Sequence, residues 1–515
     1  MGIKIALLVV FFAVMGGVGV YCKKHATDVN GFVLGGRNVG PWLTAFAYGT
    51  SYFSAVVFVG YAGQFGWKYG VAATWAGIGN AILGSLIAWA VLGRRTRVLT
   101  QHLGSATMPQ FFESRYNSET LKFVASAIVF IFLIPYTASL YNGLSRLFGM
   151  AFNIPYEYCV IAMAVLTGVY VIIGGYMATA INDFIQGIIM IVGIVAVIYS
   201  VLKVNGGFSG SIEALSQVVD TTVSTNPGAF ASIFGPDPIN LFGVVVLTSL
   251  GTWGLPQMVQ KFYAIKNEKS INKGMIISTV FALIVAGGCY FLGGFGRLFS
   301  TPELVAKNGY DSIVPTMLSG LSDLLIAIVV ILVLSASMST LSSLVLTSSS
   351  TLTLDFIKGK FAKDMKDKTQ LLIMRILIVV FIAISVIIAI DQYKNPNGSF
   401  IAQLMGVSWG ALAGAFLAPF LYGLYWKRTT KAAILVNFIF ATVFMIANVV
   451  AKDMFPVMLK SPINAGAFCM MAGLVIVPVV SLITKAPSKE HIDKVFSCYD
   501  RKVLVSVKDS IGDSE

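Results

Sequence analysis

Apolar runs of about 20 residues recur along this chain, and a helix needs a run of that length to cross a bilayer. Within lipid, the backbone polar groups must be satisfied inside the segment, as they are in a helix. Of the 515 residues, 57% are hydrophobic and 11% are charged, whereas a soluble domain carries roughly a quarter charged residues. We therefore predict an all-α polytopic membrane protein, which leaves transporter, channel and membrane-embedded enzyme as classes of function.

Thirteen membrane spans are predicted from these runs. The first span ends without a small-residue cleavage site and runs directly into the sequence CKKH, so we interpret it as a retained helix and not as a signal peptide. The predicted spans cover about residues 3–22, 42–66, 71–93, 121–148, 156–174, 178–202, 239–260, 274–298, 321–346, 370–391, 399–424, 430–451 and 463–484.

Basic residues are divided unequally between alternate loops, which predicts the orientation. The sparse loops carry Lys68, Lys203, Lys307, Lys394, Lys452 and Lys460. The dense loops carry Lys23, Lys24, Arg37, RRTR at 94–97, Lys261, Lys266, Lys269, Lys273, Lys358, Lys360, Lys363, Lys366, Lys368 and WKR at 426–428. We expect the dense loops in the cytoplasm, with the N-terminus outside and the C-terminus inside the plasma (inner) membrane. This asymmetry explains the net charge of +13 without a nucleic-acid partner.

Two of the predicted spans contain helix-breaking residues. Glycine and proline weaken the helical ladder and free backbone groups, which cannot face lipid. The two spans would hold equivalent positions in two five-helix inverted repeats, and matched broken helices are typical of a mid-membrane binding site. Two ordinary kinks are the alternative. The residues concerned are Gly49, Ser51, Ser54 and Gly60 in the second span, and Gly251, Gly254 and Pro256 in the seventh.

The ninth span ends in a stretch rich in hydroxyl groups, LSASMSTLSSLVLTSSS. Ala336, Ser339, Thr340 and Ser343 recur at the spacing of one helix face, which Ser342 borders. Hydroxyl and carbonyl oxygens are hard ligands and suit a hard cation such as Na⁺. The alternative is that these hydroxyls serve close helix packing and bond to carbonyls of their own helix.

Asp183 is the clearest carboxylate within the predicted spans. It lies near the start of the sixth span, in the sequence GGYMATAINDFIQG. Ionisable residues inside a membrane are costly and are candidates for a functional site. Capping of the N-terminus of the sixth span is the alternative, and the two roles are compatible.

Five motifs, taken in order, resemble the sodium:solute symporter family, which includes bacterial carriers for proline, pantothenate, sugars and sialic acid and the animal sodium–glucose carriers. They are FVLGGRNVGPW (32–42), MPQFFESRY (108–116), GGYMATAINDFIQG (174–187), GLPQMVQKFYAIKN (254–267) and SASMSTLSS (335–343). The resemblance implies the LeuT fold, a 5+5 inverted repeat with one extra N-terminal helix and two extra C-terminal helices.

The implied organisation divides the chain into six parts. An N-terminal helix and loop (1–38) precede the first repeat (39–204), an outer loop (205–238) and the second repeat (239–426). Two further helices (427–485) and a short cytoplasmic tail (486–515) complete the chain. The tail is too short for a kinase or another regulatory domain.

The resemblance also implies where sodium binds. The main site of the family falls on the carbonyls of Thr50, Phe53 and Ala336 and the hydroxyls of Ser339 and Thr340. Some members related to the sialic-acid carrier hold a second sodium, and its positions match Asp183, Ser342 and Ser343. We expect Na⁺ as the coupling ion and no organic cofactor.

Positions at which the chain departs from the family narrow the range of possible substrates. Proline carriers place an aspartate where this chain has Tyr52 and aromatic residues where it has Thr248 and Thr252, and sugar carriers place a polar residue where it has Val57. An apolar pocket suits a small amino acid or a monocarboxylate, whose carboxylate could sit at half-helix N-termini. Packing is an equal alternative for each candidate lining residue: Ser54, Tyr136, Asn142, Thr252, Trp253 and Gln403.

These observations predict a sodium-coupled symporter that imports a small organic solute by alternating access. The alternatives are a sodium symporter for sugar, sialic acid or pantothenate, or an uncoupled channel or facilitator. The spans contain no nucleophile elbow, metal motif or His/Asp/Glu cluster, so no enzymatic activity is expected. We expect a monomer or a weak oligomer in the lipid bilayer.

Overall fold

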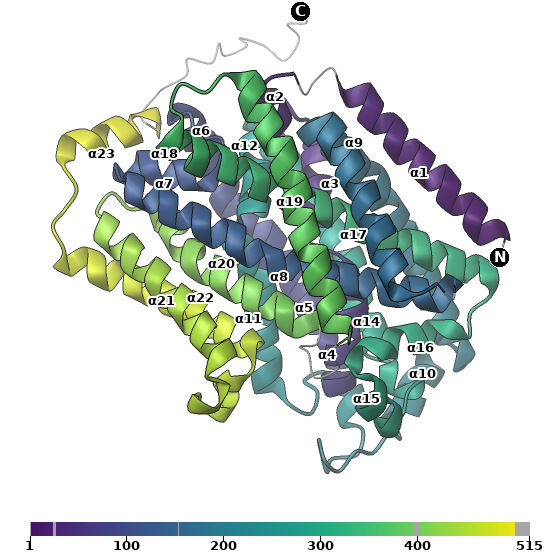
Figure 1. The fold of residues 1–515 in the computed structure, drawn as a ribbon. Coiled ribbons are helices and arrows are strands. Elements are labelled where there is room, and N and C mark those ends of the chain that lie inside the picture. Colours follow the sequence, from purple (N-terminus) through teal and green to yellow (C-terminus); the bar gives the residue numbers. More distant parts are fainter. Residues whose placement is uncertain (1, 24–26, 153, 395–400, 500–515) are drawn as a thin grey trace, which may run out of the picture.

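The computed structural model describes residues 2–23, 27–152, 154–394 and 401–499, and apart from two isolated β-bridges its regular elements are helices (Figure 1). Among the described residues, ten helices are long and apolar enough to cross a membrane, and a bent pair would make an eleventh. The all-α polytopic architecture is thus confirmed, whereas the count of thirteen spans and the inverted repeat stay predictions. Residues 399–400 of the predicted eleventh span, Lys24, and residues 500–515 of the tail lie outside the described part.

The long helices follow the predicted apolar runs closely. They are α1 (Gly2–Cys22), α8 (Glu119–Phe152), α9 (Tyr156–Val204), α13 (Lys269–Ala282), α17 (Asp323–Thr351), α19 (Asp367–Lys394), α20 (Ile401–Tyr425), α21 (Lys431–Val450) and α22 (Pro462–Ile483). The third predicted span is built from the shorter segments α5 (Thr74–Ala81), η5 (Ile82–Ile87) and η6 (Trp89–Gly93), and α6 (Arg94–His102) continues beyond it.

The helix α9 contains a sharp break between the predicted fifth and sixth spans. Gly175 has φ 56° and ψ −150°, a conformation that residues with a side chain rarely adopt. A Cβ atom at Gly175 would also lie 2.8 Å from the ring of Phe32 and 2.9 Å from its carbonyl oxygen. Glycine is therefore required here both by the backbone and by the close approach of α2 (Val29–Leu34).

Both spans that the sequence predicts to be broken are broken in the structure. The helix α3 (Pro41–Tyr52) ends at Phe53, whose backbone is extended, and the span continues through η3 (Val56–Tyr61) and α4 (Ala62–Tyr69). The helix α11 (Pro238–Gly254) ends at Leu255, and α12 (Pro256–Ala264) continues from it at an angle of 45°.

The helix α17 lies at the centre of the protein. In its most apolar window 83% of the residues are buried, compared with 33% in α19. It packs against α1, α3, α8, α9 and α19. Its serines and threonines therefore face protein on every side. The role of each of these hydroxyl groups then depends on its hydrogen-bond partners.

The two ends of the bundle carry different small elements (Figure 1). One end, called here the α23 end, carries α6, α7 (Met108–Tyr116), α18 (Gly359–Phe361) and α23 (Lys489–Phe496). The other, the α15 end, carries α10 (Gly207–Ser216), α15 (Pro302–Asn308) and α16 (Ile313–Ser319).

Lys261 corrects one expectation from the sequence. We counted it among the loop cations, but it lies in α12 and is only 1% exposed. The reason is that α12 continues the broken span past Leu255 into the protein interior.

Candidate functional site

Five oxygen atoms meet where the break after α3 faces α17, and we call this group the carbonyl site. Thr340 Oγ1 lies 3.1 Å from the Thr50 carbonyl oxygen, 3.2 Å from that of Phe53 and 3.1 Å from that of Ala336. Ser339 Oγ lies 3.3 Å from the Thr50 carbonyl oxygen and 3.0 Å from that of Ala336. All five residues are fully buried.

Local structure explains why these oxygens are available. The extended backbone at Phe53 ends α3, so the last carbonyls of that helix lose their partners in the next turn. On α17, Ala336, Ser339 and Thr340 share one face, and that face is turned toward the break. The structure therefore brings together every residue that the sequence predicts for the main sodium site.

The spacing of these oxygens fits a small hard cation. An octahedral ion with oxygen ligands at roughly 2.4 Å holds neighbouring oxygens about 3.4 Å apart. The hydroxyl-to-carbonyl distances here are 3.0 to 3.3 Å. A hydroxyl that donates to a carbonyl can rotate and turn a lone pair toward an ion. Because all five oxygen atoms are neutral, the site suits a monovalent ion better than a divalent one.

A second group lies close by and carries charge; we call Asp183 of α9, Lys261 of α12, Ser51 of α3 and Ser343 of α17 the aspartate cluster. Lys261 Nζ donates to Ser343 Oγ at 3.0 Å, and the hydroxyls of Ser343 and Ser51 lie 3.1 Å apart. The ammonium also lies 5.1 Å from the ring centre of Tyr176. Asp183 is fully buried and is an electrostatic neighbour of Lys261.

The position of Asp183 excludes the capping role. It lies eight residues beyond the break at Gly175, well inside the second half of α9. Neither of its carboxylate oxygens has a hydrogen-bond partner among the described residues. Ser342, which we predicted as a further ligand, donates instead to the Ser339 carbonyl of its own helix at 2.9 Å.

A group of unsatisfied polar atoms lies next to the carbonyl site. Ser54 directly follows Phe53, and its hydroxyl neighbours that of Tyr136 on α8. The ring of Tyr136 packs edge-on against Trp409 of α20 with 5.9 Å between ring centres. The polar side-chain atoms of all three residues are buried without a hydrogen bond of ordinary geometry within the described chain.

Tyr61 and Tyr290 extend this central polar cluster, and the sequence analysis missed them, as it missed Trp409. Both hydroxyls are buried without a hydrogen bond of ordinary geometry within the described residues, and both tyrosines are electrostatic neighbours of Tyr136. Asn80 and Thr248 are further polar neighbours of Tyr290. Their spacing along the chain carries no signal, because they come from η3 and from α14 (Gly288–Gly293). Only the folded structure brings these hydroxyls together.

Other predicted lining residues already have partners. Thr252 Oγ1 lies 2.9 Å from the Gly84 carbonyl oxygen, and Trp253 Nε1 donates to the Leu83 carbonyl at 2.9 Å. Both bonds fasten α11 to η5. Gln403 is half-buried in the first turn of α20. These residues are therefore weaker candidates for contact with a solute than Ser54 and Tyr136.

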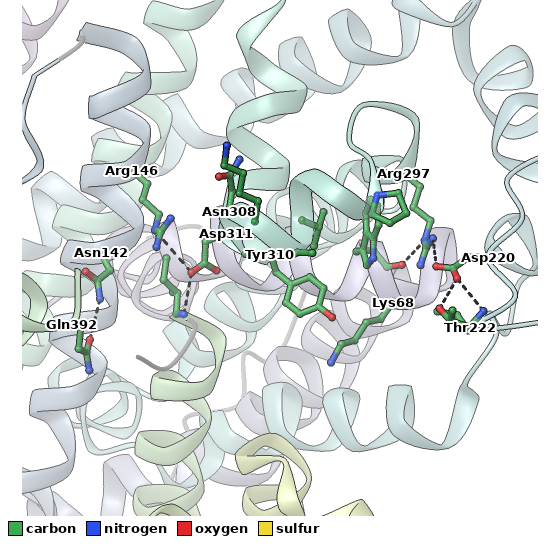
Figure 2. A pocket seen from close by; sticks show the side chains of 18 of the residues that line it. Lys68, Asn142, Arg146, Asp220, Thr222, Arg297, Asn308, Tyr310, Asp311 and Gln392 are labelled. Carbon is green, nitrogen blue, oxygen red and sulfur yellow. Dashed lines mark hydrogen bonds and ion pairs between the residues drawn. The ribbon is translucent and has the colours of Figure 1, made fainter. Parts of the chain in front are cut away.

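Asn142 lies apart from the central cluster, in a cavity of about 650 Å³ at the α15 end (Figure 2). Its amide donates to Gln392 Oε1 at 3.1 Å. Ion pairs flank the same cavity, since Arg297 Nη1 lies 2.9 Å from Asp220 Oδ2 and Arg146 Nε lies 4.0 Å from Asp311 Oδ2. The cavity, called here the vestibule, is lined by charges of both signs.

Two carboxyl groups of this vestibule lie outside the spans and differ in their environment. The Thr222 hydroxyl and the Arg297 guanidinium hold the pKa of Asp220 below its usual value. Burial raises the pKa of Asp311, and the neighbouring Arg146 opposes that rise. Asp311 also accepts from the backbone amide of Ile401, the first residue of α20, at 3.3 Å.

Broken spans that meet at a buried polar centre are features of a membrane transporter. The sequence profile of the sodium:solute symporter family matches residues 32–441. Sodium/proline symporters of Staphylococcus aureus, in strains JH9 and MW2 among others, are 30% identical over 437 residues, which cover 83% of this chain and 82% of theirs. The chain belongs to the sodium:solute symporter family.

A solved structure agrees with the fold. The Na⁺-coupled sialic acid symporter in its substrate-bound outward-open state matches with a TM-score of 0.74 at 16% identity, and the match covers 95% of this chain and 99% of that one. That likeness extends over nearly all of both chains and identifies the fold as LeuT-like.

Proposed function

We propose that this symporter couples the inward movement of Na⁺ at the carbonyl site to the uptake of a small organic solute. The observation that carries the proposal is the approach of the Thr50, Phe53 and Ala336 carbonyls to the hydroxyls of Ser339 and Thr340 at 3.0 to 3.3 Å. These oxygens come from two separate elements, the break after α3 and the middle of α17. An ion held by both joins the two elements.

This bridging gives sodium a mechanical role in alternating access. Sodium enters from outside, joins α3 to α17, stabilises the outward-open form and completes the solute site beside Ser54. Closure over the solute is followed by inward opening and by the release of sodium and then of solute. A membrane potential near 100 mV supplies roughly 2.3 kcal/mol per charge, and a tenfold sodium gradient supplies about 1.4 kcal/mol. One sodium then supports accumulation of a neutral solute on the order of several hundredfold.

The solute site that we propose is the central polar cluster of Ser54, Tyr61, Tyr136, Tyr290 and Trp409. Unsatisfied hydroxyl and indole groups are costly in the interior, and a solute with a carboxylate and a compact body would satisfy them. The half-helix that follows Ser54 has its N-terminus beside this cluster, and a helix N-terminus favours a carboxylate. Its Ala55 amide already donates to Ser337 Oγ at 3.3 Å. A small amino acid or a monocarboxylate fits these features, and the relatives named as sodium/proline symporters support the amino-acid class.

A second sodium at Asp183, Ser342 and Ser343 is a separate proposal, and Lys261 bears directly on it. The sialic acid symporter with this fold is described with a novel Na⁺ site. In this chain an ion there would compete with the ammonium of Lys261, which donates to Ser343 at 3.0 Å. We propose that this competition decides whether one or two sodium ions move in each cycle.

The orientation and assembly are likewise proposals. The α23 end carries the loops dense in lysine and arginine, so we place it in the cytoplasm of the plasma (inner) membrane, with the N-terminus outside. The charged vestibule of Figure 2 then opens to the outside. We propose that the protein works as a monomer or a weak oligomer.

Uptake into proteoliposomes tests the proposed function. The purified protein is reconstituted, an inward sodium gradient is imposed, and labelled amino acids, short carboxylates and sugars are screened. We expect accumulation of an amino acid or a monocarboxylate that requires sodium and stops when the gradient is collapsed. Uptake driven equally by a proton gradient without sodium, or solute flux without accumulation, would contradict the proposal.

A further inference from the structure

A basic cavity of about 350 Å³ lies at the α23 end, away from the transport site. It lies where α7, the start of α21 and the segment between α22 and α23 meet. Its lining includes Arg115, Thr430, Lys431, Lys485, Ser488 and His491. None of the described residues that line it is acidic, and the nearby Glu490 and Asp493 of α23 are exposed outside it.

Arg115 is a buried residue at the bottom of this cavity. Its Nε donates to the Gly423 carbonyl at 2.9 Å and its Nη2 to the Trp426 carbonyl at 3.0 Å, while Nη1 has no hydrogen-bond partner among the described residues. The residue is 0% exposed, and within the described chain no carboxylate forms an ion pair with it. A buried guanidinium without a counter-ion is costly, and a bound anion would remove that cost.

Two helix N-termini border the same cavity, because Thr430, Lys431 and Ser488 line it. Thr430 caps α21 by accepting from the Ala433 amide at 3.3 Å, and Ser488 precedes α23 without a side-chain capping bond. Helix N-termini favour anions because their amides are unsatisfied and the helix dipole is positive there. These amides add to the charges of Arg115, Lys431 and Lys485.

The surroundings of the cavity are those of a membrane surface. Leu482 and Ile483, at the end of α22, are 63% and 78% exposed, and only Thr484 separates them from the lining segment that begins at Lys485. The neighbouring Arg428 binds the carbonyl oxygen of Thr484 at 2.9 Å and so fixes the end of α22 beside the cavity. An acyl chain can therefore lie against Leu482 and Ile483 while its headgroup reaches the basic cavity.

We propose that this cavity binds the phosphate of an anionic phospholipid, which then fastens the C-terminal helix α23 to the transporter. Basic pockets between spanning helices on the cytoplasmic side recognise such headgroups. The helix α23 already contacts Arg115. The Phe496 ring centre lies 4.8 Å from the Arg115 guanidinium, and His491 Nε2 lies 3.1 Å from the Arg115 carbonyl oxygen. The lipid assignment uses the orientation proposed above and not the identity of the solute.

Lipid binding to the full-length protein tests this proposal by native mass spectrometry. The purified protein is titrated in detergent with phosphatidylglycerol and, separately, with phosphatidylcholine. We expect phosphatidylglycerol to bind about tenfold or more tightly, and K431Q/K485Q to lose that preference, because each lysine near a membrane surface contributes roughly fivefold in affinity. Should the double variant fail to fold, Lys485→Gln alone is expected to lose about fivefold.

The matched control removes the same charge from the same end. Lys489 and Lys494 lie on α23 outside the cavity lining, so K489Q/K494Q should keep its preference for phosphatidylglycerol. Equal loss in both double variants, or equal affinity for the two lipids, would overturn the proposal. A further arm of the experiment adds inorganic phosphate at millimolar concentration. The lipid assignment is wrong, and the cavity holds a free anion, if phosphate displaces phosphatidylglycerol completely and stabilises only the protein with Lys431 and Lys485 intact.

Discussion

The carbonyl site and the aspartate cluster both use hydroxyl groups of α17, yet only the aspartate cluster contains charged side chains. In the carbonyl site, Thr340 and Ser339 face three neutral carbonyl oxygens, and no protein cation reaches them among the described residues. In the aspartate cluster, Lys261 already donates to Ser343 beside the carboxylate of Asp183. Any cation in the first site would therefore have to come from solution, whereas the second contains the ammonium of Lys261.

The difference shows why counting oxygens is not enough to assign a cation site. Both groups offer hydroxyls of α17, and Ser339 and Ser343 lie only one turn apart. Only the structure reveals that one of them faces an ammonium group. The following predictions test this contrast, beginning with the largest effect.

The largest effect is expected from Thr340→Val, which keeps the shape of the side chain and removes its hydroxyl. That hydroxyl lies within 3.2 Å of all three carbonyl oxygens. A hydrogen bond to a charged group contributes roughly 1.5–3 kcal/mol, so the apparent sodium affinity of transport should fall about 10- to 100-fold. Ser349→Ala is the matched control, because that hydroxyl donates only to the Leu346 carbonyl of its own helix. Equal sodium affinity in wild type and Thr340→Val would show that the carbonyl site does not bind sodium.

The next effect is expected from Lys261→Gln. This substitution removes the cation and leaves Asp183 as an uncompensated buried charge, which typically costs 3–5 kcal/mol. Sodium should then replace the ammonium, so the variant gains a sodium-dependent rise in melting temperature and its Hill coefficient for sodium exceeds that of wild type. Lys266→Gln, at an exposed position five residues further on, should change neither quantity. If sodium does not change the melting temperature of Lys261→Gln, the aspartate cluster does not bind sodium.

A smaller effect is expected when both charges are removed together. Asp183→Asn alone leaves Lys261 without its counter-charge, but Lys261→Gln with Asp183→Asn leaves no net charge in the cluster. The double variant should recover most of the stability lost in the single variants, with a coupling energy of about 1–3 kcal/mol, and its Hill coefficient should return to 1. Thermal unfolding and sodium titration of the four proteins measure this. Strict additivity would mean that the two side chains do not interact.

The smallest effect is expected from Tyr136→Phe, which separates solute binding from sodium binding. The hydroxyl belongs to the central polar cluster and not to the carbonyl site. Its loss should raise the KM for the solute roughly fivefold and leave the apparent sodium affinity unchanged at saturating solute. Thr137→Val is the neighbouring control, because Thr137 donates to the Leu133 carbonyl of its own helix. A fall in sodium affinity without a change in KM would reassign Tyr136.

Most of the fold was predictable from the sequence for a physical reason. The length of an apolar run is visible in the sequence, and so are the glycine and proline residues of the two broken spans. The break at Phe53 lies between Ser51 and Ser54, and that at Leu255 lies between Gly254 and Pro256. The count of thirteen spans stays a prediction, because α3 and the segment Tyr156–Val169 are shorter than a membrane crossing requires.

The site was predictable only where its residues follow a helical period or a family motif. Ala336, Ser339 and Thr340 share one face of α17, and that periodicity is visible without a structure. Lys261 was misassigned because a lysine near a basic loop has the same sequence signal whether it faces water or the protein interior. Tyr61 and Tyr290 were missed because neither their spacing nor their type distinguishes them from the other tyrosines.

The central claim is that the break after α3 and the middle of α17 together bind sodium. Binding of radioactive sodium to the purified protein, without a membrane potential or a solute gradient, tests this claim most directly. We expect saturable binding to wild type and to Ser349→Ala that non-radioactive sodium displaces and potassium does not, with a loss of at least about tenfold in affinity for Thr340→Val. Equal sodium binding by wild type and Thr340→Val would contradict the claim.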